Sequence, residues 1–205
     1  MSIWFLMSVI GFIAILLPYF WSVNHLKLQD KFGKEKGTRI GDVLGMISGW
    51  GFFIFWIGIW ITPQERFTIP VLEDLAFTVP VLDISVPMTH FLVFIPCFVV
   101  GMWYGIKGVI EVSLKVAETH RPEKVITTGV YSTMRHPQYF GGLVAHVGIS
   151  FVFSAWYSLL VTPLVFIVVY VICWKEEKEL LKEFGEEYEE YRKKVPRLLP
   201  RLEIF

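Results

Sequence analysis

The chain has 205 residues, of which 54% are hydrophobic and 17% are aromatic, and its mean hydropathy is +0.54. This composition excludes an ordinary soluble globular protein and favours an integral membrane protein. The 19 basic and 19 acidic residues give a net charge of zero, which excludes a uniformly basic nucleic-acid-binding protein. The positions of the charges along the chain are therefore more informative than their sum.

The first half of the chain contains three uncharged apolar runs. A bilayer core about 30 Å thick needs roughly 20 residues of helix, and we expect membrane-spanning helices at about residues 3–23, 43–62 and 87–106. No Lys or Arg precedes Lys27, so the first run is expected to be a retained anchor rather than a signal peptide. Between the second and third runs, residues 68–73 and 78–83 repeat a proline-containing pattern that predicts a short extended hairpin.

Glycines recur every four residues in the second and third runs. They stand at Gly41, Gly45 and Gly49, and again at Gly101 and Gly105. Because residues four apart share one face of a helix, this spacing predicts close packing of neighbouring helices. The two cysteines, Cys97 and Cys173, lie in apolar runs, and we expect buried thiols with neither a disulfide framework nor a metal site.

The fourth apolar run is too long for one crossing. Residues 140–174 carry no formal charge, and a continuous helix of that length would measure about 50 Å. A hairpin of two helices, at about residues 137–153 and 156–174, is the simpler interpretation. After it, Leu181, Phe184, Tyr188 and Tyr191 recur at three- and four-residue spacing, which predicts an amphipathic cytoplasmic helix at about residues 175–193.

The basic residues predict the orientation in the membrane. Residues 24–41 and 107–135 each carry five Lys or Arg, the chain after Trp174 carries eight, and residues 63–86 carry only Arg66. The positive-inside rule therefore places the N-terminus outside and the C-terminus in the cytoplasm. The prediction is an all-α integral membrane protein with five transmembrane helices in one domain over residues 1–205, embedded in the lipid bilayer of a prokaryotic cell membrane.

One candidate binding segment lies directly before the fourth crossing. Pro137 suits the first turn of a helix, where its missing N–H costs nothing, so Arg135 and His136 would lie at the N-terminus of that helix. Exposed N–H groups, a fixed cation and an imidazole together favour binding of a carboxylate or phosphate. The alternative is that Arg135 simply extends to the lipid headgroups.

A second candidate segment follows the last crossing. Glu176 and Glu177 come directly after an uncharged run, at a depth where carboxylates are partly desolvated and can bind hydroxyls or an ammonium. A solvated charged face is the usual interpretation of such a pair. Since the predicted topology places both segments on the same side of the membrane, they predict a pocket lined by both signs of charge.

Residues from about 125 to 200 resemble the isoprenylcysteine carboxyl methyltransferase family and its phospholipid methyltransferase relatives. The matching features, in order, are Gly129-Val-Tyr131, Arg135-His-Pro-Gln-Tyr139, the pair Glu176-Glu177, Phe184-Gly-Glu-Glu-Tyr188, Tyr191 and Val195-Pro196. The resemblance implies a helical membrane enzyme that binds S-adenosyl-L-methionine at the cytoplasmic face. It also implies a lipophilic methyl acceptor that arrives from the bilayer, and neither a metal nor a nucleic acid.

The same resemblance assigns roles to individual residues within a cofactor-binding region at about residues 123–200. From the chemistry of their side chains, Arg135 would orient the negative group of the acceptor, and His136 or a glutamate would be the base for an amine acceptor. His146 would either border the acceptor tunnel or satisfy a neighbouring carbonyl. The glycine-rich strand-to-helix fingerprint of soluble methyltransferases is missing from the sequence. The cofactor-binding residues implied by the resemblance are Val125, Ile126, Tyr131, His136, Pro137, Tyr139, Glu176 and Glu177.

Two positions depart from the pattern of the prenylcysteine enzymes. Those enzymes carry an arginine one turn before the glutamates and a histidine thirteen residues before the equivalent of His136, where this chain has Ile172 and Glu123. These departures affect the identity of the acceptor more than the binding of the cofactor. We predict methyl transfer to the carboxylate of an isoprenylcysteine-like acceptor, with a phospholipid amine or a small thiol as the alternative.

Two other classes of protein remain as alternatives. A transport or structural protein is disfavoured because the predicted crossings contain no charged residue at mid-membrane and the two halves show no repeat. A haem protein would need ligands such as His90 and His146. The predicted topology puts these two histidines at different depths, so they are not expected to share a haem.

Overall fold

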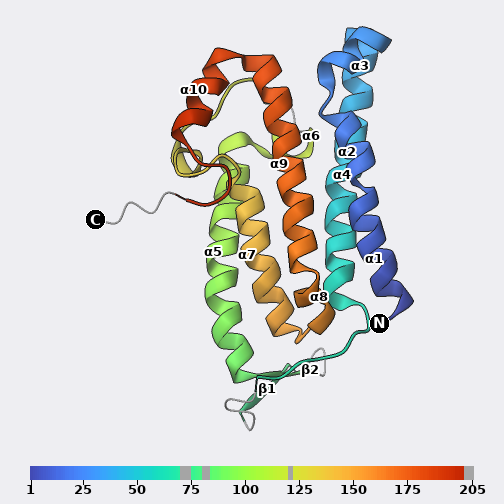
Figure 1. Ribbon diagram of the computed structural model, residues 1–205, viewed down its shortest axis with the longest axis vertical. Coiled ribbons are helices and arrows are strands. Elements are labelled where there is room, and N and C mark those ends of the chain that lie inside the picture. Colours follow the sequence, from blue (N-terminus) through green and yellow to red (C-terminus); the bar gives the residue numbers. More distant parts are fainter. Residues whose placement is uncertain (70–74, 80–83, 120–121, 201–205) are drawn as a thin grey trace.

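The computed structural model describes residues 1–69, 75–79, 84–119 and 122–200, and these are mostly helical (Figure 1). A bundle of long helices forms the body, and two short strands lie at one end of it. The elements are α1 (Ile3–Ala14), α2 (Leu16–Ser22), α3 (His25–Phe32), α4 (Lys34–Ile61), β1 (Ala76–Val79), β2 (Ile84–Pro87), α5 (Met88–Val112), α6 (Leu114–Thr119), the 3₁₀ turn η1 (Gly129–Ser132), α7 (Pro137–Val152), α8 (Trp156–Leu160), α9 (Thr162–Phe184) and α10 (Glu186–Lys194).

Three helices in the described part of the chain are long and apolar enough to cross a membrane. They are α1 together with α2 (Ile3–Ser22), α4 (Lys34–Ile61) and α5 (Met88–Val112). This confirms the first three predicted crossings. However, α4 begins nine residues before the predicted start at 43 and α5 ends six residues after the predicted end at 106. The charged residues at these ends favour the interface over the bilayer core, but they do not stop a helix.

The predicted hairpin after Pro137 is formed by α7 and α9. The turn falls at residues 153–155, where Ser154 has a φ of 51°. α7 has 16 residues, about 24 Å of helix, so length and composition confirm three of the five predicted crossings. The separate tail helix predicted at residues 175–193 is wrong, because α9 continues through Trp174 to Phe184 and the break comes at Gly185, where φ is 51°.

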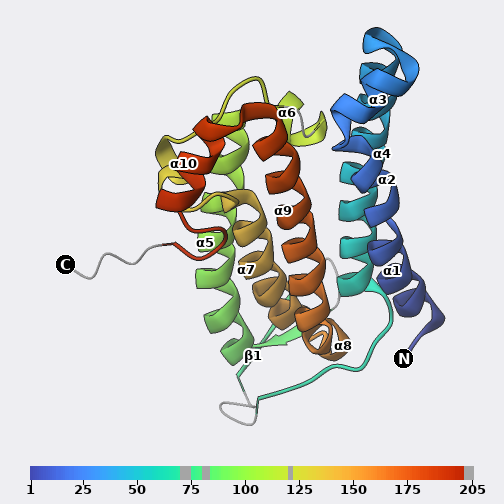
Figure 2. The ribbon, with the colours of Figure 1, turned by 45° about the horizontal axis from the view of Figure 1, so that its top comes forward.

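The two ends of the bundle differ in the elements that they carry. The N-terminus, the β1–β2 hairpin and α8 lie at one end, and α3, α6 and α10 lie at the other (Figures 1 and 2). The strands are antiparallel, with Ala76 opposite Pro87. They do not coincide with the predicted segments at residues 68–73 and 78–83, parts of which lie outside the described residues. Arg66 pairs with Ala155 in an isolated bridge, which joins the loop after α4 to the turn after α7.

Glycines allow α5 and α7 to approach closely. A Cβ on Gly141 would lie 2.5 Å from the carbonyl oxygen of Gly101 and 2.6 Å from the backbone nitrogen of Gly105. Backbone atoms cannot move aside as the end of a flexible side chain can, so this position requires glycine. The predicted packing role of Gly101 is confirmed, because its Cβ would lie 2.7 Å from the carbonyl oxygen of Gly141, whereas a Cβ on Gly49 or Gly105 would meet no atom within 4 Å.

The buried core lies between the N-terminal helices and the second half of the chain. Phe12 of α1, Trp56 of α4 and Val165 of α9 are 4% exposed or less and belong to one apolar cluster. Tyr19 of α2 is part of the same cluster and is 3% exposed. This packing fixes the side chain of Tyr19 against the C-terminal half of α9, where the candidate site lies.

The contact between α5 and α7 makes a testable prediction. We expect Gly141→Ala to destabilise the fold by about 1 to 3 kcal/mol, because the added methyl group would overlap backbone atoms of α5. Gly105→Ala is the matched control, since its Cβ would meet no atom within 4 Å and alanine favours a helix over glycine. Unfolding of the detergent-purified variants, followed by circular dichroism, measures the difference. Equal stabilities would contradict the close approach.

Candidate functional site

Side chains from several elements line a cleft. The elements α3, α6 and α10, which contribute to it, lie at one end of the bundle (Figure 2). The cleft has about 900 Å³ of empty space, part of it open to solvent. Its wall combines α3, the C-terminal end of α5, α6, η1, the start of α7, the C-terminal half of α9 and α10. The predicted site residues that line it are Val125, Ile126, Tyr131, Arg135, His136, Tyr139 and Glu176.

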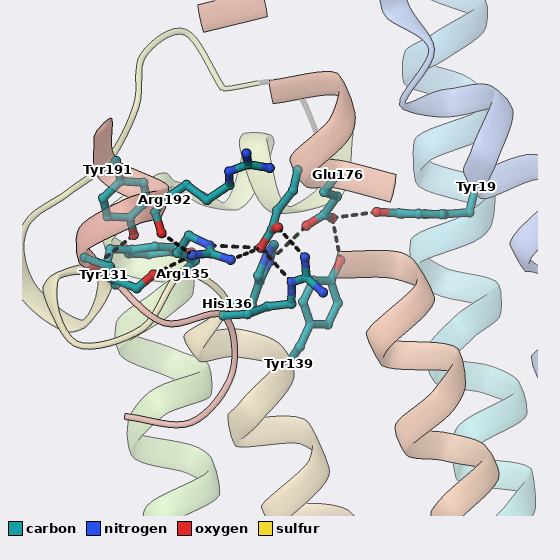
Figure 3. A network of polar contacts seen from close by, with 11 residues as sticks. Tyr19, Tyr131, Arg135, His136, Tyr139, Glu176, Tyr191 and Arg192 are labelled. Atoms are coloured by element: carbon teal, nitrogen blue, oxygen red, sulfur yellow. Dashed lines mark hydrogen bonds and ion pairs between the residues drawn. The ribbon is translucent and has the colours of Figure 1, made fainter. Parts of the chain in front are cut away.

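Glu176 is held by side chains from α2 and from the start of α7 (Figure 3). The hydroxyls of Tyr19 and Tyr139 both donate to its Oε1 at 2.6 Å. His136 Nδ1 lies 3.3 Å from its Oε2. The carboxylate of Glu176 therefore has a fixed position in the wall of the cleft, although it remains 17% exposed.

His136 bridges the two glutamates. Its Nε2 lies 3.2 Å from Glu177 Oε1, while its Nδ1 faces Glu176. Burial alone would lower the pKa of the imidazole, but Cys173, Glu176 and Glu177 together raise this pKa well above its ordinary value. The ring is therefore an imidazolium at neutral pH, and both of its N–H groups donate to carboxylates.

Glu177 lies behind the cleft and is 3% exposed. Arg135 Nε and Arg197 Nε each donate to its Oε1 at 2.9 Å, and Arg197 Nη2 donates to its Oε2 at 2.7 Å. Burial alone would raise the pKa of this carboxyl, but its contacts with His136, Arg197 and Arg135 hold the pKa well below its ordinary range. Glu177 does not line the cleft, so its predicted contact with a cofactor stays a prediction.

The side chain of Arg135 points inward and binds the segment at residues 192–195 to the site. Its side chain is 8% exposed, and its Nη1 donates to the carbonyl oxygens of Arg192, at 2.8 Å, and Val195. The backbone N–H groups of Arg135 and His136 donate to Pro196 and Arg197 at 2.9 and 3.0 Å. An extension of Arg135 to lipid headgroups does not agree with this geometry. Its predicted role in orienting the acceptor stays a prediction.

Tyrosines form much of the remaining wall. Gln138 Nε2 donates to the hydroxyl of Tyr131 at 3.0 Å, and the hydroxyl of Tyr191 donates to the carbonyl oxygen of Tyr131 at 2.7 Å. Burial is the main cause that raises the pKa values of Tyr131, Tyr188 and Tyr191 above the ordinary value. These side chains are therefore neutral and present aromatic faces and hydroxyls to the cleft.

Several residues that line the cleft or contact Glu176 could not be identified from the sequence. Tyr19 lies in the first apolar run, 157 positions before Glu176, and no local pattern marks it. Gln138 lies inside the recognised segment but has no assigned role. The other charged or titratable residues that line the cleft and had no predicted role are His25, Lys124, Glu179 and Glu183.

Pro137 and His146 have positions away from the cleft lining. Pro137 is buried at the first turn of α7, as its place in the sequence predicts. His146 is fully buried, and its Nδ1 accepts hydrogen bonds from Trp56 and Trp60, both at 2.9 Å, while its Nε2 lies 3.3 Å from Thr162 Oγ1. The tunnel role of His146 stays a prediction. Among the described residues, no cluster of His, Cys, Asp or Glu could hold a metal ion, and both cysteines are free.

A second, mostly apolar cavity adjoins the cleft. It has about 1080 Å³ of empty space, part of it open, and lies among α2, α4, α5, α6, α7 and α9, with Ile15 before α2 also in its wall. Ala117, Gln138 and Tyr139 line both spaces. Ile172, which stands where the prenylcysteine enzymes have an arginine, lines the apolar cavity. A polar cleft and an apolar cavity therefore meet at one wall that contains Tyr139.

Comparison with known proteins supports the resemblance. Residues 89–187 match the family described as phospholipid methyltransferase. A probable protein-S-isoprenylcysteine O-methyltransferase of Oryza sativa subsp. japonica is 39% identical over 88 residues, which cover 39% of this chain and 42% of the rice protein. Protein-S-isoprenylcysteine O-methyltransferase of Schizosaccharomyces pombe is 32% identical over 92 residues, 41% of this chain and 36% of that protein.

A bacterial protein with a different name also matches. The nickel-cobalt-cadmium resistance protein NccN of Alcaligenes xylosoxydans xylosoxydans is 30% identical over 82 residues, 40% of this chain and 38% of that protein. The matched region spans less than half the length of each of these relatives. The predicted family resemblance is confirmed over residues 89–187, and about two fifths of the chain is similar to part of each of these methyltransferases.

The buried ion cluster makes a second prediction. We expect Arg135→Met to destabilise the fold by about 3 kcal/mol, because it removes a partner of the buried Glu177 and leaves two carbonyl groups without their donor. Arg192→Met is the matched control, since that guanidinium is 39% exposed and pairs only with Glu189 at the surface. Thermal unfolding in detergent distinguishes the two, and similar losses would argue against the cluster.

Proposed function

We propose that this protein is a membrane methyltransferase that transfers a methyl group from S-adenosyl-L-methionine to a lipophilic acceptor. The observation that carries the proposal is the junction at Tyr139 between a polar cleft and an apolar cavity. Methyl transfer to a lipid-like acceptor needs a polar, charged cofactor and an apolar chain to meet at one point. The names of the related proteins support the same reaction class.

The residues of the cleft fit this cofactor. S-adenosyl-L-methionine carries a carboxylate, an ammonium, two ribose hydroxyls and an adenine. Lys124 suits the carboxylate, the positive charge of the His136 imidazolium attracts it without a direct hydrogen bond, and Glu176, Glu179 and Glu183 suit the ammonium and hydroxyls. Aromatic faces for the adenine and the sulfonium come from the four tyrosines of the cleft wall, Tyr131, Tyr139, Tyr188 and Tyr191.

The protein's contribution to the reaction is mainly orientation and exclusion of water. The bound cofactor supplies a methyl group that its sulfonium already activates. Tyr19 and Tyr139 fix Glu176 at the inner wall, and the cluster behind them keeps His136 charged and in place. Holding two reactants in a productive orientation can provide a large part of such a rate acceleration.

The acceptor is expected to enter through the apolar cavity. An isoprenylcysteine-like carboxylate would attack the methyl group without a general base, and the printed names of several relatives favour it. A phospholipid amine is the second candidate, because apolar Ile172 provides no cation for a carboxylate at the position where the prenylcysteine enzymes have an arginine. An amine must first lose a proton, and Glu176 is the carboxylate of the cleft wall that lies nearest the junction residue Tyr139.

The proposed location is a membrane with five crossings and the cleft in the cytoplasm. In Figure 1 the chain runs between the two ends of the bundle in α1 with α2, α4, α5, α7 and α9. The end that carries α3 and α10 holds most of the Lys and Arg residues, in agreement with the positive-inside rule. A prokaryotic cell membrane remains our proposal for the membrane itself.

Cofactor binding tests the proposal directly. We expect saturable binding of S-adenosyl-L-methionine or its demethylated product in calorimetry on the folded, detergent-purified protein. Glu176→Gln and His136→Ala should each weaken binding by about 1 to 3 kcal/mol, the scale for loss of a charge-assisted contact. Glu190→Gln, on the exposed face of α10, should bind as the wild type does. A folded protein that does not bind S-adenosyl-L-methionine saturably would contradict the enzyme proposal and favour a transport or structural role.

The acceptor requires a separate experiment. We expect transfer of a radiolabelled methyl group to prenylcysteine analogues, in a panel that also contains aminophospholipids and small thiols. Since a carboxylate needs no general base, transfer to it should persist at pH values well below those that an amine acceptor requires. Transfer to aminophospholipids alone would replace the first candidate by the second. Transfer to small thiols alone would leave the apolar cavity without its proposed role.

A further inference from the structure

The apolar cavity ends at Trp56. Seven residues of α4 line this space, from Met46 to Trp56, and Trp56 is the one nearest the C-terminal end of α4. On α7 the lining runs from Gln138 at the junction with the cleft to Gly142. The indole of Trp56 lies against Gly142, where an added Cβ would be 2.9 Å from the edge of the ring. Trp56 therefore forms the floor of the cavity, at the end away from the cleft.

The indole of Trp56 is fixed by apolar and polar contacts. Its ring lies 4.9 Å from the ring of Phe52 and 5.7 Å from that of Phe12. Its Nε1 donates to His146 Nδ1 at 2.9 Å, and Trp60 Nε1 donates to the same nitrogen, also at 2.9 Å. His146 itself is fully buried and lines neither the cleft nor the cavity.

This arrangement determines the proton position on His146. A nitrogen that accepts from two indole N–H groups cannot carry a proton, so the ring is neutral and its proton is on Nε2. Nε2 lies 3.3 Å from Thr162 Oγ1. Both ring nitrogens therefore have polar neighbours inside the bundle, and the imidazole acts as a fixed acceptor rather than as an acid or base.

We propose that Trp56 sets the length of the acceptor chain and that His146 is the positioning residue that holds Trp56 as the floor of the cavity. This rests on the proposed function, in which the cavity receives the apolar chain of the acceptor. A smaller side chain at position 56 deepens the cavity and admits longer chains. Loss of the nitrogen at position 146 that accepts the hydrogen bond frees the indole of Trp56 and removes the same limit on chain length.

The test is the chain-length preference of binding. S-geranyl, S-farnesyl and S-geranylgeranyl derivatives of N-acetylcysteine compete with a dansyl-labelled farnesylcysteine on protein in lipid nanodiscs. Each derivative partitions into the nanodisc lipid to the same extent whichever protein variant is present. We therefore compare, between variants, the ratios of the competition constants of the three derivatives. Binding of the demethylated cofactor to the same samples shows that the cleft is folded.

We expect Trp56→Phe to shift the preference toward the longest chain by about tenfold, the scale on which an apolar pocket discriminates small differences in ligand size. Trp60→Phe is the matched control, because Trp60 donates to the same nitrogen but does not line the cavity. It should keep the wild-type preference. His146→Leu should shift the preference as Trp56→Phe does, and His146→Gln, which retains an acceptor, should restore it.

The double variant His146→Leu, Trp56→Phe should shift the preference no further than Trp56→Phe alone, because both changes act on one side chain. An unchanged preference in folded Trp56→Phe, or an equal shift in Trp60→Phe, would overturn the proposal while leaving the methyltransferase function intact. Chain-length selection without any cofactor binding would instead overturn the proposed function and leave the role of Trp56 in place. Failure of every chain to bind the folded wild type would overturn both.

Discussion

The candidate site depends on one imidazolium that is held between two carboxylates. Glu176 and Glu177 are adjacent in α9 and therefore point about 100° apart around the helix. His136, just before α7, contacts both of them. This contact joins the two arms of the α7–α9 hairpin at the end where the cleft opens. Without it, Glu176 would still face the cleft and Glu177 the interior, but α9 and the start of α7 would lack a shared charged contact.

A buried carboxylate such as Glu177 is costly unless several donors surround it. Those donors are Arg135, His136 and Arg197, and Arg197 lies beyond residues 89–187, the part that matches the phospholipid methyltransferase family. The N–H groups of Arg135 and His136 also hold the backbone at Pro196 and Arg197. The segment after α10 is therefore part of the folded site, and the electrostatic requirement of Glu177 explains why.

The sequence predicted the parts of the site that are local. A proline at the first turn of α7 placed His136 at a helix start, and the end of an uncharged run placed Glu176 near the interface. Tyr19 could not be predicted, because its contact with Glu176 arises from packing of the N-terminal helices against α9 over 157 positions. The starting residue of α4 was wrong for a different reason, since hydropathy marks where a helix enters lipid and not where its hydrogen bonds begin.

The two neighbouring glutamates also differ in the kind of donor that fixes them, and this difference divides their tasks. Glu177 is surrounded by guanidinium groups, which cancel its charge and use it as a structural centre. Two tyrosine hydroxyls and the shared His136 imidazolium fix Glu176, so it contacts one cation where Glu177 contacts three, and its charge is cancelled less completely. In the proposed function this arrangement presents a negative charge beside the aromatic junction, where a cationic cofactor and an apolar chain must meet. Tyr139 belongs both to that junction and to the support of Glu176, so the position of the carboxylate and the opening to the acceptor cavity depend on the same side chain.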